Sequence, residues 1–132
     1  MKKWTKELLI SEGYEINNAK IEDVDLSTLD HGVLTLTMPI KGEGWGCVYG
    51  GRVLGVGGTY MNYEDIKGYP LGLDSILYIM KVVGVNNFND LKNQYIRVAT
   101  KGWGDSIEII GNVIKDEWFD YCSFFKDESE DN

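Results

Sequence analysis

The sequence predicts an α+β fold, in which a mainly antiparallel sheet carries one principal helix and a short N-terminal helix. Three patterns favour this class. Apolar side chains alternate over Val33–Ile40, which is typical of a half-buried strand. A nearly continuous apolar run over Leu71–Val83 is ended by Gly84, as a helix commonly is. Gly102 and Gly104 separate two further strand-like stretches and indicate a second hairpin.

The first part of the chain is expected to form the N-terminal helix and a first hairpin. Residues Lys2–Gly13 place apolar side chains at helical spacing and end in glycine. A strand over Ala19–Leu26 follows. The turn Asp30-His31-Gly32 then pairs it with the strand over Val33–Ile40. Because Pro39 has no backbone N–H, we expect a sheet edge or a strand end there.

The rest of the chain is expected to complete the sheet around the principal helix. That helix is apolar around most of its circumference, so it must be covered on more than one side. Either the sheet or another subunit can cover it, and we expect both to contribute, which implies a homo-oligomer. The remaining segments are a surface loop over Tyr60–Pro70, a turn over Phe88–Leu91, strands over Tyr95–Thr100 and Ser106–Ile114, and a closing segment over Lys115–Tyr121 that packs back on the sheet.

Length and composition indicate one folded domain. The 132 residues include 43% hydrophobic side chains, enough for a core but not for two domains. We expect a globular domain over residues 1–126, with a helical extension at 1–17 and a disordered acidic tail at 127–132. The sequence has neither an apolar run of membrane-spanning length nor a signal-peptide pattern. Cys47 and Cys122 lack metal-ligand spacing, which favours reduced thiols in a cytoplasmic protein.

The net charge of −8 argues against binding to long nucleic acid, whose affinity depends on many lysine and arginine contacts to phosphates. A small phosphorylated ligand remains compatible with this charge, because it needs only a few local cations and backbone N–H groups. Part of the negative charge lies in the C-terminal tail.

The segment Gly42–Gly51, GEGWGCVYGG, combines glycines with two aromatic rings. It lacks both the Gly-Lys-Ser/Thr of a triphosphate loop and the GxGxxG spacing of a dinucleotide fold. Two interpretations stay open. The glycines allow a bulged strand, or the same backbone also holds a ligand, with N–H groups toward phosphates and a ring on a base. The candidate binding residues here are Gly44, Trp45, Gly46, Tyr49, Gly50, Gly51 and Arg52.

A second group of candidates, Arg97, Lys101 and Trp103, lies in and after the strand over Tyr95–Thr100. Cations beside an aromatic ring suit a nucleotide, because stacking contributes roughly 1–3 kcal/mol per base. A surface arginine beside a packed tryptophan is the alternative. The chain has only two arginines, Arg52 and Arg97, and each lies in one of these glycine-flanked segments. Together the two segments predict a local anion site.

Catalytic and metal sites have little support. His31 is the only histidine, and Asp30-His31-Gly32 reads more readily as a turn than as a general base. Asp23, Asp25 and Asp30 lack the spacing of a calcium loop. We expect neither catalytic residues nor a metal, and no cofactor.

The order of several segments resembles the phage anti-Thoeris nucleotide-sponge family, the first type of Thoeris anti-defence protein, whose members counter the Thoeris bacterial immune system. The segments are NAKI, DHGVLTLTM, GEGWGCVYGG, GLDSILYIMKVVGVNNFNDLKNQYIRVATKGWG and IIGNVIKDEWFD, and the resemblance spans about Asn18 to Phe125. Family members bind cyclic ADP-ribose isomers without cutting them. The resemblance implies a homo-oligomer (dimers building to hexamers) in the bacterial cytoplasm during infection. Some members also take cyclic oligonucleotides at a second site.

The resemblance also implies site residues. It maps the family's glycine-rich segment onto Gly44, Gly46, Gly50 and Gly51, its aromatic or basic positions onto Tyr49, Arg97 and Lys101, and a polar position onto Asn112. Two departures stand out. Arg52 lies where an aromatic residue is usual, which bears on ligand choice. An extension of about 17 residues precedes NAKI and bears on assembly or on covering a pocket.

Three functions are therefore compared. The favoured one is a phage anti-defence protein that sequesters a small cyclic nucleotide without cleaving it. The alternative is an acidic protein-interaction inhibitor of a host defence enzyme or nuclease, which the net charge of −8 and the acidic tail suggest. A phosphodiesterase that uses His31 has the least support.

Overall fold

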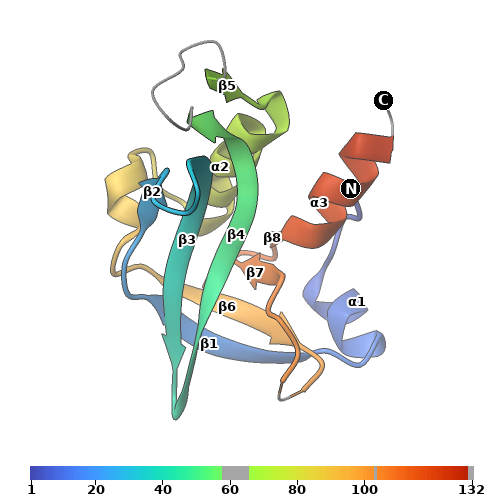
Figure 1. Cartoon of the computed structure of the whole chain (residues 1–132). Helices are drawn as coiled ribbons and strands as arrows, with labels where there is room; N and C mark the ends of the chain where they lie inside the picture. The colour runs from blue at the N-terminus through green and yellow to red at the C-terminus, as the bar shows by residue number, and fades with distance from the viewer. Residues whose placement is uncertain (58–65, 103, 131–132) are drawn as a thin grey trace.

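The computed structural model describes residues 1–57, 66–102 and 104–130 of the chain (Figure 1). The predicted α+β class is confirmed: within these residues an antiparallel eight-stranded sheet carries the helices. The elements are α1 (Lys6–Ser11), β1 (Glu15–Ile21), β2 (Asp25–Ser27), β3 (Val33–Gly42), β4 (Trp45–Gly57), β5 (Ile66–Gly68), α2 (Pro70–Val83), the 3₁₀ turn η3 (Phe88–Leu91), β6 (Tyr95–Thr100), β7 (Ile109–Gly111), β8 (Trp118–Asp120) and α3 (Tyr121–Glu130).

The sheet runs in the order β5-β4-β3-β1-β6-β7-β8, with β2 paired to β3 beside this path. Figure 1 shows that β3 and β4 stand crosswise to β1 and β6, so the sheet bends strongly between the two pairs. This bend brings β4 toward the connection between β6 and β7. The Tyr49 hydroxyl of β4 spans that gap and donates to the Glu108 carbonyl at 3.0 Å.

Two apolar clusters lie on opposite faces of the sheet. The larger one includes Ile96, Val98 and Ile110 and is covered by α2. The smaller one contains Trp4, Leu9, Ala99 and Ile109. Successive residues of a strand point to opposite faces, so β6 and β7 contribute to both clusters. The N-terminal extension thus covers the face that α2 leaves open.

The N-terminal helix exists but is shorter than the predicted Lys2–Gly13. It begins after Thr5, whose hydroxyl accepts from the Leu8 N–H at 3.1 Å, and Gly13 with φ 93° follows its end. The residues before it are tied to the far end of the chain instead. Trp4 donates through Nε1 to the Asp120 carboxylate at 3.0 Å.

The predicted strand over Ala19–Leu26 is two strands, β1 and β2, which pair with different parts of β3. Pro39 lies inside β3 rather than at an edge or an end. It stands where the neighbour of β3 changes from β2 at Thr37 to β1 at Ile40, and its carbonyl accepts from the Glu22 N–H at 2.8 Å. A residue without an N–H is tolerated there because neither strand continues the ladder past it.

Several elements later in the chain end or turn where the sequence predicts. Helix α2, ended by Gly84 with φ 94°, the turn η3 and strand β6 are confirmed. The strand expected over Ser106–Ile114 is only β7, and most of the expected loop over Tyr60–Pro70 lies outside the described residues. The tail expected to be disordered from 127 is helical to Glu130, since α3 extends from a first turn anchored by buried Tyr121 and Phe124.

Candidate functional site

The glycine-rich segment forms the β3–β4 hairpin and a bulge in β4. Gly44 lies in the hairpin turn with φ 78°. Gly50 and Gly51 have φ 102° and 88°, and the pairing of β3 with β4 shifts register beside them, between Thr35 and Thr37. The bulged strand of the first interpretation is therefore confirmed.

Tyr49 is not available as a stacking surface. Its side chain is 1% exposed, its ring lies edge-on to Tyr121 at 5.4 Å between centroids, and its hydroxyl is bonded to the Glu108 carbonyl. The predicted stacking of this ring on a base is therefore corrected, because the ring is buried in the larger apolar cluster.

Arg97 and Asn112 lie together, but their side chains form hydrogen bonds to backbone carbonyls of the protein itself. Arg97 donates through Nε to the Asn112 carbonyl at 2.7 Å and through Nη2 to the Lys115 carbonyl at 2.8 Å, and its guanidinium lies 4.7 Å from the Trp118 ring centroid. The Asn112 amide donates to the Val82 carbonyl at the end of α2 at 2.9 Å. These contacts hold the β7–β8 turn to β6 and α2, so the predicted anion contact of Arg97 is replaced by backbone carbonyls.

Two hollows flank the β6–β7 connection, and Thr100 and Asp105 line both. The first, which we call the α3 hollow, has a volume of about 480 Å³ and is lined by Tyr14, Ala99, Thr100, Lys101, Asp105, Ser106, Glu108, Ile109, Asp120, Cys122, Ser123 and Lys126. The second, the hairpin hollow, has a volume of about 660 Å³ and is lined by Glu15, Ile16, Asn17, Asn18, Glu43, Trp45, Gly46, Cys47, Thr100, Gly102, Gly104, Asp105 and Ile107.

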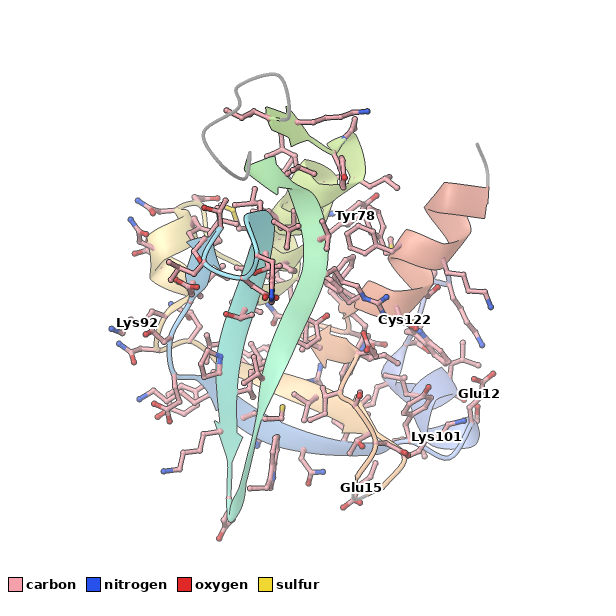
Figure 2. All side chains as sticks on the ribbon, viewed as in Figure 1. Glu12, Glu15, Tyr78, Lys92, Lys101 and Cys122 are labelled. Atoms are coloured by element: carbon pink, nitrogen blue, oxygen red, sulfur yellow. The ribbon has the colours of Figure 1, made fainter. Side chains whose placement is uncertain are left out.

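The α3 hollow mixes cations, carboxylates and hydroxyls. Lys101 and Lys126 line it, and the Lys101 Nζ lies 4.8 Å from the Tyr14 ring centroid. Arg52 stands at its rim, with Nη2 3.6 Å from a Glu108 carboxylate oxygen. Partial burial opposes the charge on Arg52, but Glu108 and the Cys122 thiol outweigh it and hold the pKa of Arg52 above its usual value. Figure 2 labels Lys101 near α1 and Cys122 at the start of α3, on the two sides of this hollow.

The hairpin hollow brings together the two glycine-flanked segments, as Trp45 and Gly46 face Gly102 and Gly104 across it. Its charge is the opposite of the expected one. Its charged lining groups are carboxylates, and no lysine, arginine or histidine lines it among the described residues. Trp103 lies outside those residues. The structure thus divides the predicted anion site: Trp45 and Gly46 lie at one hollow, and Arg52 and Lys101 at the other. The other predicted glycines, Gly44, Gly50 and Gly51, line neither hollow.

His31 lies at the exposed turn before β3, outside the lining of both hollows. Its Nδ1 is 2.6 Å from the Asp30 carboxylate, and the two side chains are 94% and 68% exposed. His31 has a left-handed φ of 54° in this turn. Within residues 1–57, 66–102 and 104–130, no group of histidine, cysteine and acidic side chains is placed to hold a metal ion.

Several lining residues of the α3 hollow were not predicted. Lys126 and Tyr14 come from opposite ends of the chain, and neither belongs to a motif. Ser106 and Glu108 lie close to Lys101 in sequence, so the connection after β6 was the only local signal for them. Their grouping depends on α3 folding back beside the N-terminal extension, as Figure 1 shows.

No family model, curated protein or solved structure matches the chain. In the part of the chain that the structure describes, no helix is both long and apolar enough to cross a membrane.

Proposed function

We propose that the chain binds and sequesters a small cyclic nucleotide, a cyclic ADP-ribose isomer, in the α3 hollow and does not cleave it. The observation that carries the proposal is the convergence of Lys101 and Lys126 on this hollow, with Arg52 at its rim. Cations supply the electrostatic attraction that phosphates require. The hairpin hollow lacks such groups among its described lining residues.

The other lining groups suit the rest of such a ligand. Ribose hydroxyls donate to carboxylates, and Glu108 and Asp120 line this hollow and not the hairpin hollow. Asp120 already accepts from Trp4 Nε1 and from the Ser123 N–H, both at 3.0 Å. The half-buried Tyr14 ring lines the hollow beside Lys101, whose Nζ lies 4.8 Å from the ring centroid, so an aromatic ring and a cation adjoin there. A mixture of cations, carboxylates and a ring matches a phosphate–ribose–base ligand better than a simple anion.

Sequestration needs tight binding, and nanomolar affinity corresponds to about 12 kcal/mol. A hollow whose shape exists before binding reduces the ordering cost that a ligand must overcome. Here the carboxylate of Asp120 is held by the N-terminal extension, and Arg52 by Glu108, so part of the lining is already fixed.

The resemblance to the anti-Thoeris sponges supports the biological setting. On that basis the protein acts in the cytoplasm of an infected bacterium, removing an immune signal, and it assembles as a homo-oligomer. Helix α2 supports the assembly, because Leu73 and Leu77 are 65% and 59% exposed on one of its faces. Large apolar side chains grouped on a helix face are common at subunit interfaces.

Retention of intact ligand tests the function. Purified protein is incubated with cyclic ADP-ribose isomers, separated from unbound ligand and denatured by heat, and the released material is analysed by chromatography. We expect one isomer to be recovered unchanged. Recovery of a cleaved product would indicate an enzyme instead, and no retention would contradict sequestration.

Variants locate the ligand. Lys101→Ala and Lys126→Ala should each weaken binding about tenfold or more, as a charge-assisted hydrogen bond contributes roughly 1.5–3 kcal/mol. Lys67→Ala is the matched control, because Lys67 is exposed on β5 and lines neither hollow. Equal affinity in all three variants would place the ligand elsewhere. Arg97→Ala is a poor probe of the site, since this side chain braces the β7–β8 turn.

A second candidate function remains the acidic inhibitor of a host defence enzyme or nuclease. The helical order of the acidic segment to Glu130 favours it, because an ordered charged helix can be recognised by a partner. Truncation after Lys126 separates the two proposals. An inhibitor that acts through this segment should lose activity, whereas the retained nucleotide should be unchanged in a sponge.

A further inference from the structure

The hairpin hollow is the larger of the two described hollows, at about 660 Å³, and the proposed nucleotide does not occupy it. The β3–β4 hairpin and the start of β1 line one side, and the β6–β7 connection lines the other. Glu15 stands opposite Thr100 in the β1–β6 ladder, which fixes the distance between these sides. Figure 2 shows Glu15 and Lys101 at this same end of the molecule.

One side of the hollow is a tryptophan ring with a fixed position. Trp45 pairs with Gly42 across the hairpin, and a Cβ built on Gly42 would lie only 2.0–2.3 Å from indole atoms. The ring therefore rests directly on the Gly42 backbone, in space that any side chain would fill. It also packs against the main apolar cluster while lining the hollow. An aromatic surface held in this way is ready for a ligand without rearrangement.

The charged groups around this ring are three carboxylates from separate segments: Glu15 at the start of β1, Glu43 in the hairpin turn and Asp105 in the β6–β7 connection. None of the three forms an ion pair with another described residue. They are also too dispersed to form a metal-binding group in the described chain. Separated negative charges favour an extended cation over a single metal ion. The Asn17 and Asn18 amides add hydrogen-bonding capacity to the lining.

We propose that the hairpin hollow binds an aliphatic polyamine, a linear organic cation with two or more ammonium groups. The ammonium groups lie beside Glu15, Glu43 and Asp105, and one of them faces the Trp45 ring, whose π face attracts cations. The methylene groups between them cover the indole and Ile107. Phosphate-bearing ligands are disfavoured here by like charge, so this site and the proposed nucleotide site take ligands of opposite sign.

Titration of ¹⁵N-labelled full-length protein with spermidine, putrescine and butylamine tests the proposal. We expect saturable binding of spermidine. The largest NMR chemical-shift changes should occur at the Trp45 indole N–H and at the backbone N–H groups of Gly46 and Gly104. Putrescine should bind more weakly, and butylamine at least about tenfold more weakly than spermidine, because each ammonium–carboxylate contact at an exposed site contributes a modest amount.

The variant Glu15→Gln/Glu43→Gln removes two carboxylates that line only this hollow, and spermidine binding should weaken about tenfold. The charge-matched control Glu22→Gln/Asp74→Asn changes two exposed acids outside both hollows and should bind spermidine as the unchanged protein does. All four substituted side chains are exposed, so the fold is kept, and circular dichroism verifies this.

Equal weakening in both double variants would overturn the proposal, since it would show diffuse attraction to a chain of net charge −8. Chemical-shift changes that do not include Trp45 and Gly46 would also overturn it. Nucleotide retention by Glu15→Gln/Glu43→Gln should be unchanged, because neither residue lines the α3 hollow. Failure of the polyamine site can thus be distinguished from failure of the proposed nucleotide function.

Discussion

The side chain of Tyr49 is 1% exposed and spans the interior from β4 to the carbonyl of Glu108. Burial is the main reason that its pKa is raised well above the usual value, and the nearby Tyr121 and Glu108 raise it further. Burial likewise raises the pKa of Tyr121. Both phenols are therefore held neutral at a pH where free tyrosine ionises.

These two phenols predict a loss of stability at alkaline pH. Above about pH 10 the unfolded chain releases the phenolic protons while the folded chain keeps them, so the free energy of unfolding falls. The fall should approach about 1.4 kcal/mol per pH unit for each such group until the folded pKa is reached. Urea unfolding between pH 8 and 11 measures it.

Tyr49→Phe should make that alkaline fall less steep, because it removes one buried phenol. The control is Tyr95→Phe, since Tyr95 is 61% exposed and should leave the slope unchanged. The same slope in the unchanged protein and in Tyr49→Phe would contradict the prediction. At neutral pH, Tyr49→Phe should also cost about 1 kcal/mol, through its lost hydrogen bond to Glu108.

The sequence shows which candidate side chains suit a nucleotide, but it does not show what these side chains contact in the fold. Arg97 and Tyr49 have side chains that suit a nucleotide, and both use them on the protein itself. Nothing local in the sequence reveals this. The carbonyls that Arg97 contacts belong to Asn112 and Lys115, and they reach it only because β7 pairs with β6.

At the scale of elements, the bulge in β4 decides which way its side chains face. Before the bulge, Trp45 and Tyr49 point toward the main cluster, and Val48 between them is 63% exposed. After it, Leu54 points inward and Val53 is 42% exposed. The alternation of the strand is therefore reversed across Gly50 and Gly51. This reversal turns Arg52 toward Glu108 at the α3 hollow.

Substitutions at the two bulge glycines should have different costs. Both have left-handed φ values, of 102° at Gly50 and 88° at Gly51, so a Cβ strains each by roughly 1–2 kcal/mol. At Gly50 that Cβ would also lie 2.3 Å from the Leu36 carbonyl oxygen, whereas at Gly51 nothing lies within 4 Å. Gly50→Ala should thus lower the free energy of unfolding by clearly more than Gly51→Ala.

Equilibrium denaturation in urea compares the two variants. An equal decrease in the free energy of unfolding would mean that the Leu36 backbone moves away from the new Cβ at no energetic cost. The bulge would then be less rigid than its pairing indicates. Binding supplies a second readout. Because the bulge orients Arg52, Gly50→Ala should also weaken nucleotide retention, and Gly51→Ala should affect it less.

Elements that depend on local signals were predictable, and those that depend on a distant partner were not. Helix α2 is bounded by Pro70 and by Gly84, both visible in the sequence. The division of the predicted strand over Ala19–Leu26 into β1 and β2 has no such signal. It follows from the bend of the sheet, where β3 exchanges one neighbour for another at Pro39.

For the whole molecule, the net charge of −8 conceals two hollows of different character on either side of the β6–β7 connection. The composition gives only the net charge of the chain and not the charge of either hollow. The α3 hollow takes Tyr14 from one end of the chain and Lys126 from the other, and neither could be assigned to it without the fold, although Lys101 and Arg52 were candidates from the sequence. Of the glycine-rich segment's candidates, Trp45 and Gly46 line the hairpin hollow, whose carboxylates the segment does not indicate.

The last prediction concerns the assembly of the chain. Leu73 and Leu77 project from α2 with 65% and 59% of their surfaces exposed, on the side away from buried Ser75 and Ile79. If subunits meet here, the apolar surface of each leucine is removed from water only in the oligomer. A charge at each position would then disfavour assembly while leaving the subunit core intact, because neither side chain contributes to that core.

Light scattering coupled to size exclusion tests this with Leu73→Asp/Leu77→Asp. The unchanged protein should elute at a multiple of its 14.9 kDa chain mass, and the double variant at the mass of one chain. Leu29→Asp/Ile114→Asp is the matched control, because these side chains are 89% and 86% exposed on other segments and should leave the assembly unchanged. A single-chain mass for the unchanged protein would refute the homo-oligomer, and an intact assembly in the α2 variant would move the interface to another surface.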